Sequence, residues 1–191
     1  MTNILNFDKY LDSLFESMNS PKNIEWKEKG EKKWLGYFNV DKHKYMIRIF
    51  NNGNSIYSGK FFIEDENKDW SPDMIGENKA TNTMIVMSTI KKAYFEFFEI
   101  VDINAMVISS TGNSKGKRFL YNLFCNECIK MKPNFIYEKK SKVHSKNIEN
   151  NKLKENISVL YIIYKNDFDL NLLNQTINDI IVNDSREFIL E

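Results

Sequence analysis

The strongest constraint on the fold is a helical pattern that runs from Thr81 to Val101. Apolar side chains recur there at intervals of three and four residues, which is the period of an α-helix with one broad buried face. The residues on that face are Ile85, Val86, Thr89, Ile90, Ala93, Tyr94, Phe97, Phe98 and Val101. Because a face this wide has to be covered by other elements, the pattern predicts a central, heavily buried helix.

Before this helix the sequence has the pattern of β-strands. Residues 34–40, 45–50 and 56–63 are rich in aromatic and β-branched side chains, and the links 41–44 and 51–54 are turn-like. These three segments predict an antiparallel meander. It is preceded by a charged connector over residues 27–33 and followed by a polar loop over residues 64–80.

After the central helix the chain continues with a buried strand, a turn, a helix, a hairpin and a last helix. The expected bounds are 103–110 for the strand, 111–116 for the turn, Lys117 to Met131 for the helix, 135–139 and 157–164 for the hairpin strands, 140–156 for a basic loop between them, and 170–182 for the last helix. A short amphipathic helix is also expected near the N-terminus, ending before Pro21.

This order predicts an α+β fold, with α/β-like character, built on a mixed and mostly antiparallel sheet with a long central helix. With 191 residues the chain has the length of one domain. We expect a single domain over residues 1–191, with an N-terminal helix in 1–20, a core in 34–165 and a C-terminal helix in 166–191.

Composition excludes several classes of protein. The chain is 42% hydrophobic, which is too apolar for wholesale disorder. No apolar run approaches the roughly 20 residues that a membrane-spanning helix needs, so we expect no membrane partner. The first ten residues lack the pattern of a signal peptide, which leads us to expect a cytoplasmic protein with reduced thiols at Cys125 and Cys128.

One block of the sequence resembles a known group of proteins. It consists of Met84–Ile90, Glu96-Phe97-Phe98, Ala105–Ile108, a small-residue turn, and the run Lys117-Arg118-Phe119-Leu120-Tyr121. Over about residues 34–165 the chain looks like a group of phage and bacterial proteins with a degenerate acetyltransferase-like (GNAT-like) fold. The resemblance implies a GNAT-like sheet. It also implies a phage-encoded, non-catalytic protein without a cofactor, which acts through protein–protein contacts with a protein partner or as a homo-oligomer. Such a protein would belong to the virion or modulate a host factor in the bacterial cytoplasm.

A divergent acetyl-CoA-dependent N-acetyltransferase is the alternative that the same resemblance implies. In that superfamily a glycine-containing loop before the long helix holds the cofactor pyrophosphate on backbone N–H groups. Here the corresponding stretch, residues 76–83, lacks the paired small residues, and Glu77 would repel a pyrophosphate. If acetyl-CoA does bind, Asn82, Thr83 and Met84 would receive it, and Tyr121 would protonate the leaving thiolate.

Two basic segments predict contacts with anions. Lys115, Lys117 and Arg118 lie where a turn leads into a helix, and a helix N-terminus attracts anions, although the spacing of Gly112 and Gly116 does not fit a Walker loop. Residues 115–154 carry eleven basic and three acidic side chains. Within that segment, the lysines at 139, 140, 142 and 146 are typical either of a nucleic-acid-binding surface or of a solvated hairpin loop. The first interpretation makes the chain a nucleic-acid-binding accessory protein, which is the second alternative to the protein-contact function. The candidate residues are Lys139, Lys140, Lys142 and Lys146.

The cysteines and histidines predict no metal site. Cys125 and Cys128 share a helix face and could hold a metal or a redox pair, but there is no second cysteine pair. His43 and His144 are far apart in sequence, in an expected turn and an expected loop. Buried small side chains and surface histidines are the simpler interpretation.

Overall fold

The computed structural model describes residues 20–64, 67–71, 80–110, 115–149 and 152–187. Its strands follow the chain as β1 (Glu25–Lys29), β2 (Lys33–Val40), β3 (His43–Asn51), β4 (Ile56–Glu64), β5 (Trp70–Ser71), β6 (Ala105–Ser110), β7 (Phe135–Glu149) and β8 (Lys152–Lys165). The helices are α2 (Ala80–Ile100), α3 (Lys115–Met131) and α4 (Leu170–Glu187). None of the described helices is long and apolar enough to cross a membrane.

The predicted fold class is confirmed. Seven strands are ordered β1-β2-β3-β4-β6-β8-β7, with β5 paired to the end of β4. One pair is parallel, β4 with β6, from Ile56↔Ala105 to Gly59↔Ile108, and α2 is the crossover that connects these two strands in sequence. The pairs β1–β2, β6–β8 and β7–β8 are antiparallel. The result is a mixed, mostly antiparallel sheet with a long helix, as the sequence predicts.

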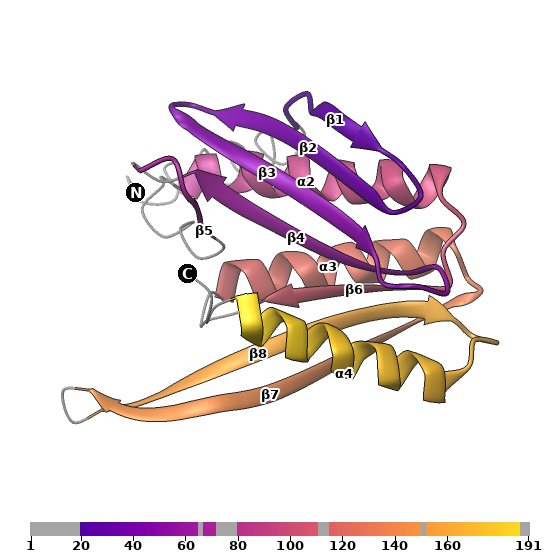
Figure 1. Ribbon diagram of the computed structural model, residues 1–191. Helices are drawn as coiled ribbons and strands as arrows, with labels where there is room; N and C mark the ends of the chain where they lie inside the picture. Colours follow the sequence, from indigo (N-terminus) through magenta and orange to yellow (C-terminus); the bar gives the residue numbers. More distant parts are fainter. Residues whose placement is uncertain (1–19, 65–66, 72–79, 111–114, 150–151, 188–191) are drawn as a thin grey trace, which may run out of the picture. The chain divides into compact units, whose positions relative to one another are not determined.

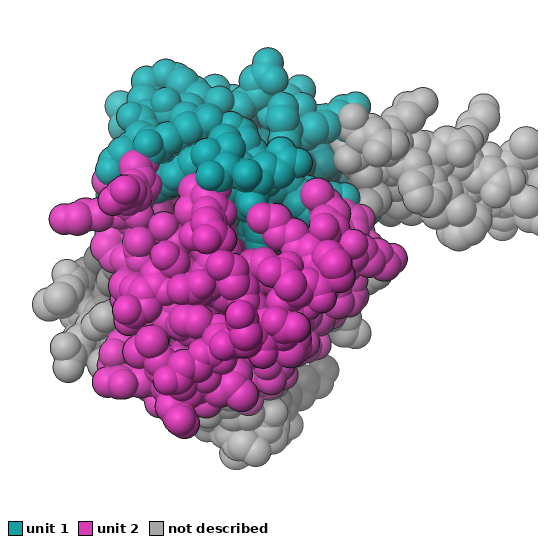
Figure 2. Space-filling model, turned by 90° about the vertical axis from the view of Figure 1, so that its right-hand side faces the viewer, with its two compact units in different colours: residues 1–29, 34–48, 61–100 teal, residues 30–33, 49–60, 101–191 magenta. Residues whose placement is uncertain are grey.

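The chain divides into two compact units, coloured separately in Figure 2. Unit 1 comprises residues 1–29, 34–48 and 61–100, and unit 2 comprises residues 30–33, 49–60 and 101–191. The expected helix in residues 1–20 lies outside the described residues, apart from Ser20.

Unit 1 is a piece of sheet with α2 on one of its faces. Burial alternates along β2 and β3, with Trp34, Phe38, Tyr45 and Ile47 buried and the residues between them partly exposed. The buried side chains meet α2, where the ring of Trp34 lies edge-on to that of Phe97 at 5.2 Å. The predicted burial of this helix is therefore confirmed, since Val86, Ile90, Ala93, Tyr94, Phe97 and Phe98 are all at most 3% exposed.

Unit 2 has a helix on each side of its strands. Helix α3 packs on β6, β7 and β8. Helix α4 places Leu173, Ile177 and Ile180 against the opposite side, where the partners are Ile56, Ala105, Val107, Leu160, Ile162 and Tyr164. This three-layer arrangement buries both faces of β6, which explains why its sequence is an uninterrupted apolar run.

Three sequence expectations about loops are wrong. The expected polar loop over 64–80 contains the short strand β5, which pairs with β4 through Ile63↔Ser71 and Glu64↔Trp70. The other two concern charged segments. The charged connector over 27–33 is in large part strand, because β1 pairs with β2 through Trp26↔Gly36 and Lys29↔Trp34. The basic loop over 140–156 is instead a continuation of the hairpin, with pairing from Phe135↔Lys165 out to Glu149↔Lys152. Both segments are rich in charged residues and lack apolar alternation, so their strand character comes from backbone pairing with a neighbour.

Candidate functional site

Tyr121, the candidate general acid, lies in the core of unit 2. Its side chain is 3% exposed, and its ring packs against that of Tyr161 on β8 at 5.3 Å. The Tyr161 hydroxyl in turn donates to the backbone carbonyl of Arg118 at 3.3 Å. Burial raises the pKa of Tyr161 to about 12, against a smaller opposing effect of the Arg118 charge. Tyr121 thus belongs to an aromatic layer between α3 and the sheet.

The residues proposed to receive a cofactor lie in the first turns of α2. The helix begins at Ala80, so Asn82, Thr83 and Met84 are helical, and the first turn contains no acidic residue. Thr83 and Met84 are half-buried. The preceding stretch, which holds Gly76 and Glu77, lies outside the described residues. Free N–H groups at a helix start are a general feature of helices and do not identify a cofactor.

The candidate anion site lies at the start of α3. Lys115, Lys117 and Arg118 all fall in the first turn of this helix, which contains no acidic residue. Arg118 is half-buried, and its positive charge acts on Tyr161 beneath it. The side chains of Lys115 and Lys117 lie outside the described part. The helix begins at Lys115, two residues earlier than the sequence predicts, so all three positions share its first turn, and an anion site there stays a prediction.

Both cysteines are core residues of α3. Cys125 is 0% and Cys128 2% exposed, and burial raises the pKa of the Cys125 thiol. In the part of the chain that the structure describes, no group of three or more His, Cys, Asp or Glu side chains could hold a metal. His43 is half-buried at the start of β3, and His144 belongs to β7.

The four candidate nucleic-acid-binding lysines all lie on β7. The ammonium group of Lys139 lies over the Tyr161 ring at 5.9 Å from its centroid. Lys140 donates to the amide oxygen of Asn174 on α4 at 2.9 Å, and its ammonium nitrogen is 3.7 Å from the Glu138 carboxylate. Lys142 and Lys146 continue along the same strand.

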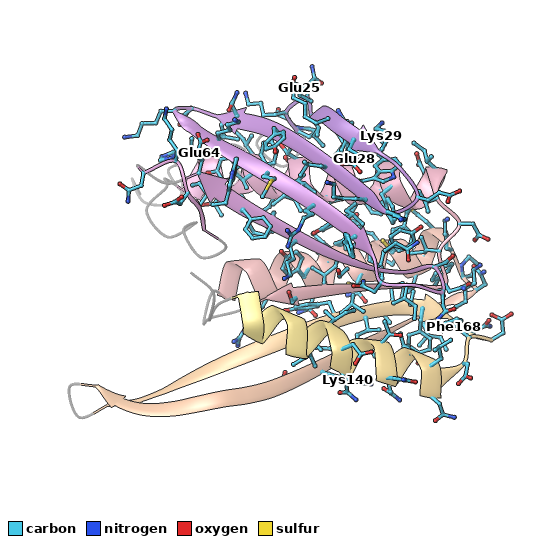
Figure 3. The ribbon with its side chains drawn as sticks, in the orientation of Figure 1. Glu25, Glu28, Lys29, Glu64, Lys140 and Phe168 are labelled. Carbon is cyan, nitrogen blue, oxygen red and sulfur yellow. The ribbon has the colours of Figure 1, made fainter. Side chains whose placement is uncertain are left out.

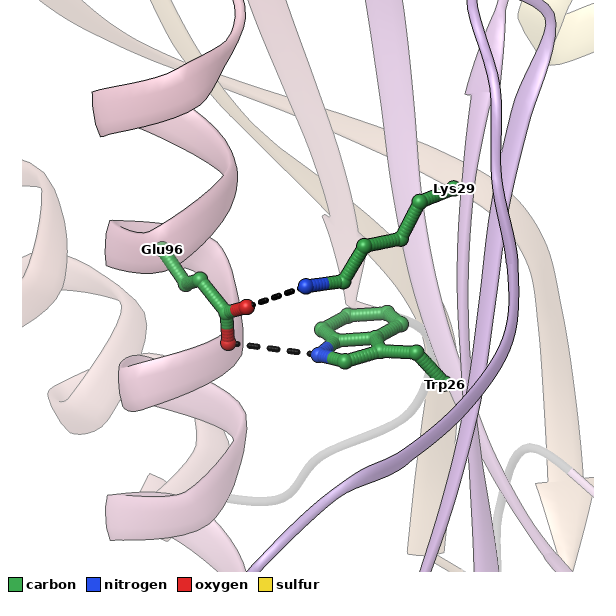
Figure 4. Close-up of polar contacts among 3 residues, drawn as sticks. All are labelled: Trp26, Lys29 and Glu96. Carbon is green, nitrogen blue, oxygen red and sulfur yellow. Dashed lines mark hydrogen bonds and ion pairs between the residues drawn. The ribbon is translucent and has the colours of Figure 1, made fainter.

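A polar cluster that sequence reasoning missed connects β1 to α2. The Glu96 carboxylate accepts one hydrogen bond from the indole N–H of Trp26 at 3.2 Å and another from Lys29 at 2.5 Å (Figure 4). The Lys29 ammonium also lies over two indole rings, 5.4 Å from the centroid of Trp26 and 5.0 Å from that of Trp34. Burial tends to raise the pKa of Glu96, but the two hydrogen bonds and the charges of Lys29 and Lys92 outweigh it, so the pKa is lowered.

A second feature that sequence reasoning missed is the sheet surface of unit 1 on the side away from α2, which we call the open face. Its side chains alternate with the buried ones and are partly or fully exposed. They include Leu35, Tyr37, Lys44, Met46, Arg48, Phe62, Glu64 and Trp70. Within unit 1, α2 is the one helix that the described residues form, and Figure 1 shows it behind the strands β1 to β4.

Cations and aromatic rings are interleaved on the open face. The Lys44 ammonium lies 5.1 Å from the Tyr37 ring centroid, 5.7 Å from that of Trp70, and 3.9 Å from the Glu64 carboxylate. Arg48 lies over Phe62 at 5.3 Å. Glu25 and Glu28 on β1 and Glu64 at the end of β4 border the face (Figure 3). Positive and negative charges are therefore both present around an aromatic and apolar centre.

No protein-family model matches the chain, and no curated protein matches its sequence. Among solved structures, the chain is similar to an acetyltransferase of Bacillus subtilis that was crystallised in complex with CoA. The two share 11% sequence identity with a TM-score of 0.38, over 73% of this chain and 97% of that one.

Proposed function

We propose that this chain acts through protein–protein contacts rather than through catalysis, and that the open face of unit 1 is the contact surface. The observation that carries the proposal is the composition of that face. Tyr37, Phe62, Trp70, Met46 and Arg48 represent the residue types enriched in the cores of protein interfaces. Tryptophan, tyrosine and arginine are also the commonest residues at positions that dominate binding energy.

The charges of the face favour a protein over a nucleic acid as its partner. Lys44 and Arg48 are accompanied by Glu25, Glu28 and Glu64, so the surface lacks the excess of positive charge that binding to phosphates requires. The partner we propose has an apolar surface with carboxylates placed opposite Lys44 and Arg48. In line with the sequence resemblance, it is a virion protein, a host factor in the bacterial cytoplasm, or a second copy of this chain.

The burial of Tyr121 supports a non-catalytic role. A general acid has to reach the atom that it protonates, and a tyrosine that is 3% exposed and packed on another ring is poorly placed for this. The absence of paired small residues in the sequence before α2 points the same way. Under this proposal neither acetyl-CoA nor CoA is a ligand.

The test combines two measurements on the full chain. Calorimetric titration with acetyl-CoA and CoA measures cofactor binding, and light scattering together with pull-down from host extract measures association. The variants are Tyr37→Ala and Phe62→Ala on the open face, with Glu99→Ala, exposed on α2, as the matched control.

The proposal expects association with a second copy or a defined protein that both open-face variants weaken at least tenfold and the control leaves unchanged. It also expects no heat of cofactor binding at millimolar concentration. A monomer that binds acetyl-CoA with micromolar affinity, about −8 kcal/mol, would instead establish the acetyltransferase alternative. Association that is unaffected by both open-face variants would remove this face from the function.

A further inference from the structure

The β7–β8 hairpin is much longer than the strand beside it. Pairing between β6 and β8 ends at Ser110↔Val159, where β7 contributes Ser141. Beyond this point residues 142–149 and 152–158 pair only with each other in the described structure, and we call them the basic ribbon. At roughly 3.3 Å per residue it is about 25 Å long. Figure 1 shows it extending past the end of β6 as a narrow two-stranded arm of unit 2.

The charge of this part of the hairpin is strongly positive. Lys139 and Lys140 lie at its base, and Lys142, Lys146, Lys152 and Lys154 lie along the ribbon. Between residues 139 and 158 the sequence has two acidic residues, Glu149 and Glu155, and Glu155 pairs with Lys146 in the register of the ribbon. Six lysines against two glutamates give residues 139–158 a surplus of four positive charges in a chain whose net charge is +1. The two basal lysines are exposed, with 45% of the Lys140 side chain accessible.

The geometry suits a groove of duplex DNA. Two paired strands are about 4.8 Å apart, and the major groove of B-form DNA, about 12 Å wide, admits a two-stranded ribbon. Lysines distributed along such an arm meet phosphates on both sides of the groove and release counterions. A basic loop without strand pairing, as the sequence alone predicted, would have no such fixed width. The register Lys142↔Ser158 and Asn147↔Lys154 fixes the spacing of the cationic positions instead.

We propose that the basic ribbon is a DNA-binding arm that lies in the major groove of double-stranded DNA, through phosphate contacts and without base specificity. This inference concerns unit 2 and is independent of the protein contact proposed for the open face. Polyanion binding by lysines alone would not distinguish duplexes, whereas a ribbon that fits a groove prefers the wide major groove of B-form DNA to the deep, narrow one of A-form RNA.

The experiment measures fluorescence anisotropy of a labelled mixed-sequence DNA duplex with the full chain at low and physiological salt. The same sequence is also used as single-stranded DNA and as an RNA duplex. The ribbon variant carries Lys142→Gln, Lys146→Gln and Lys152→Gln. The control carries Lys42→Gln, Lys92→Gln and Lys130→Gln, which change the net charge equally at exposed positions elsewhere. Circular dichroism and melting show whether both variants are folded.

The expected result for the unmodified chain is a dissociation constant of about 10⁻⁴ to 10⁻⁶ M near physiological salt, which weakens about 10²- to 10³-fold between 50 and 200 mM salt. The ribbon variant should bind DNA at least tenfold more weakly, and the slope of its log affinity against log salt concentration should be less steep by about 2.7. The control should change little in both respects. Absence of duplex binding at low salt, or equal loss in ribbon and control variants, would overturn the proposal. Equal or tighter binding of single-stranded DNA or duplex RNA would overturn insertion into the major groove.

Discussion

The indole of Trp26 and the carboxylate of Glu96 form a hydrogen bond of 3.2 Å between residues that are 70 positions apart in the chain. Trp26 belongs to β1, the outermost strand in the sheet order, and Glu96 belongs to α2. Nearby, the backbone N–H of Lys22 donates to the side-chain oxygen of Thr89, also on α2, at 2.9 Å. The first described strand of the chain is thus tied to the central helix by polar contacts, and Trp26 also packs on Trp34 of β2, whose ring meets Phe97 on α2.

Replacing Glu96 with glutamine should weaken this tie. The Glu96→Gln variant loses the ion pair with Lys29, whose side chain is 37% exposed, while an amide oxygen can still accept from Trp26. Because the pair is partly in water, we expect a loss of about 0.5–1 kcal/mol in the free energy of unfolding at neutral pH, measured by urea denaturation. Glu99→Gln, at an exposed position of the same helix, is the matched control and should change stability less.

The Glu96 carboxylate should also make the free energy of unfolding depend on pH. The pKa of Glu96 is lowered below its ordinary value of 4.5, so the folded state favours the charged form. Its stabilising contribution is therefore complete above pH 4.5 and is lost as the pH falls through the lower, folded-state pKa. The stability difference between the unmodified chain and Glu96→Gln should shrink steadily in acid. If the difference in the free energy of unfolding stayed constant as the pH fell below 4.5, the charge on Glu96 would not contribute to stability.

Gly36 should not tolerate a side chain. It is buried and pairs with Trp26, and a Cβ atom there would lie 2.7 Å from both Cε3 of Trp26 and Cγ2 of Ile24. Those side chains would have to move, so we expect Gly36→Ala to lower the free energy of unfolding by about 1–3 kcal/mol and to change the tryptophan emission. Gly30→Ala is the control, because its Cβ would be 3.7 Å from the Lys33 carbonyl oxygen, an ordinary contact.

How far the sequence predicts the fold depends on whether each element buries apolar side chains. The alternation in β2 to β4 and the helical period of residues 81–101 identify these elements, because burial of one face imposes the pattern. Strand β1 reads Glu-Trp-Lys-Glu-Lys, and only Trp26 in it is partly buried, so backbone pairing rather than side-chain burial makes it a strand. The same is true of the basic ribbon.

The candidate sites divide in a similar way. Lys115, Lys117 and Arg118 are neighbours in sequence, so their grouping at the start of α3 follows from one helix boundary. The open face cannot be assigned from one such boundary. Alternation along the strands implies that about half of their aromatic side chains are buried, but it does not say which half. The structure places Phe38, Tyr45 and Phe61 inside and Tyr37 and Phe62 on the open face. The contact between Trp26 and Glu96 depends on tertiary packing over 70 residues, and no local pattern indicates it.

Tyr121 should behave as a core residue. Its ring fills space against Tyr161, so Tyr121→Ala should reduce the free energy of unfolding by about 3–5 kcal/mol, measured by guanidinium denaturation. Tyr121→Phe keeps the ring and should cost much less, about 1 kcal/mol. The opposite pattern, in which Tyr121→Phe leaves stability unchanged but abolishes acetyl transfer, would restore the catalytic role.

The two cysteines should be protected from thiol reagents in the folded protein. Cys125 and Cys128 are 0% and 2% exposed, and burial raises the pKa of Cys125, which lowers the population of the reactive thiolate. We expect reaction with a disulfide reagent such as DTNB to be slow in buffer and complete within seconds to minutes in concentrated guanidinium. Rapid modification of the native protein at mildly alkaline pH would contradict this assignment.

Tyr161 should make the folded state sensitive to alkali. Burial raises its pKa from 10.0 to about 12, so the folded protein holds the phenol proton more tightly than the unfolded chain does. The corresponding stabilisation is fully present below pH 10 and is lost as the pH rises from 10 towards 12. In Tyr161→Phe this part of the alkaline loss should disappear, so the free energy of unfolding should decline less steeply over that range. Tyr164, whose pKa is also raised to about 12 by burial and by its hydrogen bond to Glu138, remains in the variant and contributes to a residual decline. Burial also raises the pKa values of Tyr57, Tyr137 and Cys125, which contribute in the same direction. Urea denaturation at a series of alkaline pH values measures the difference, and identical slopes in both proteins would show that Tyr161 ionises as freely when folded as when unfolded.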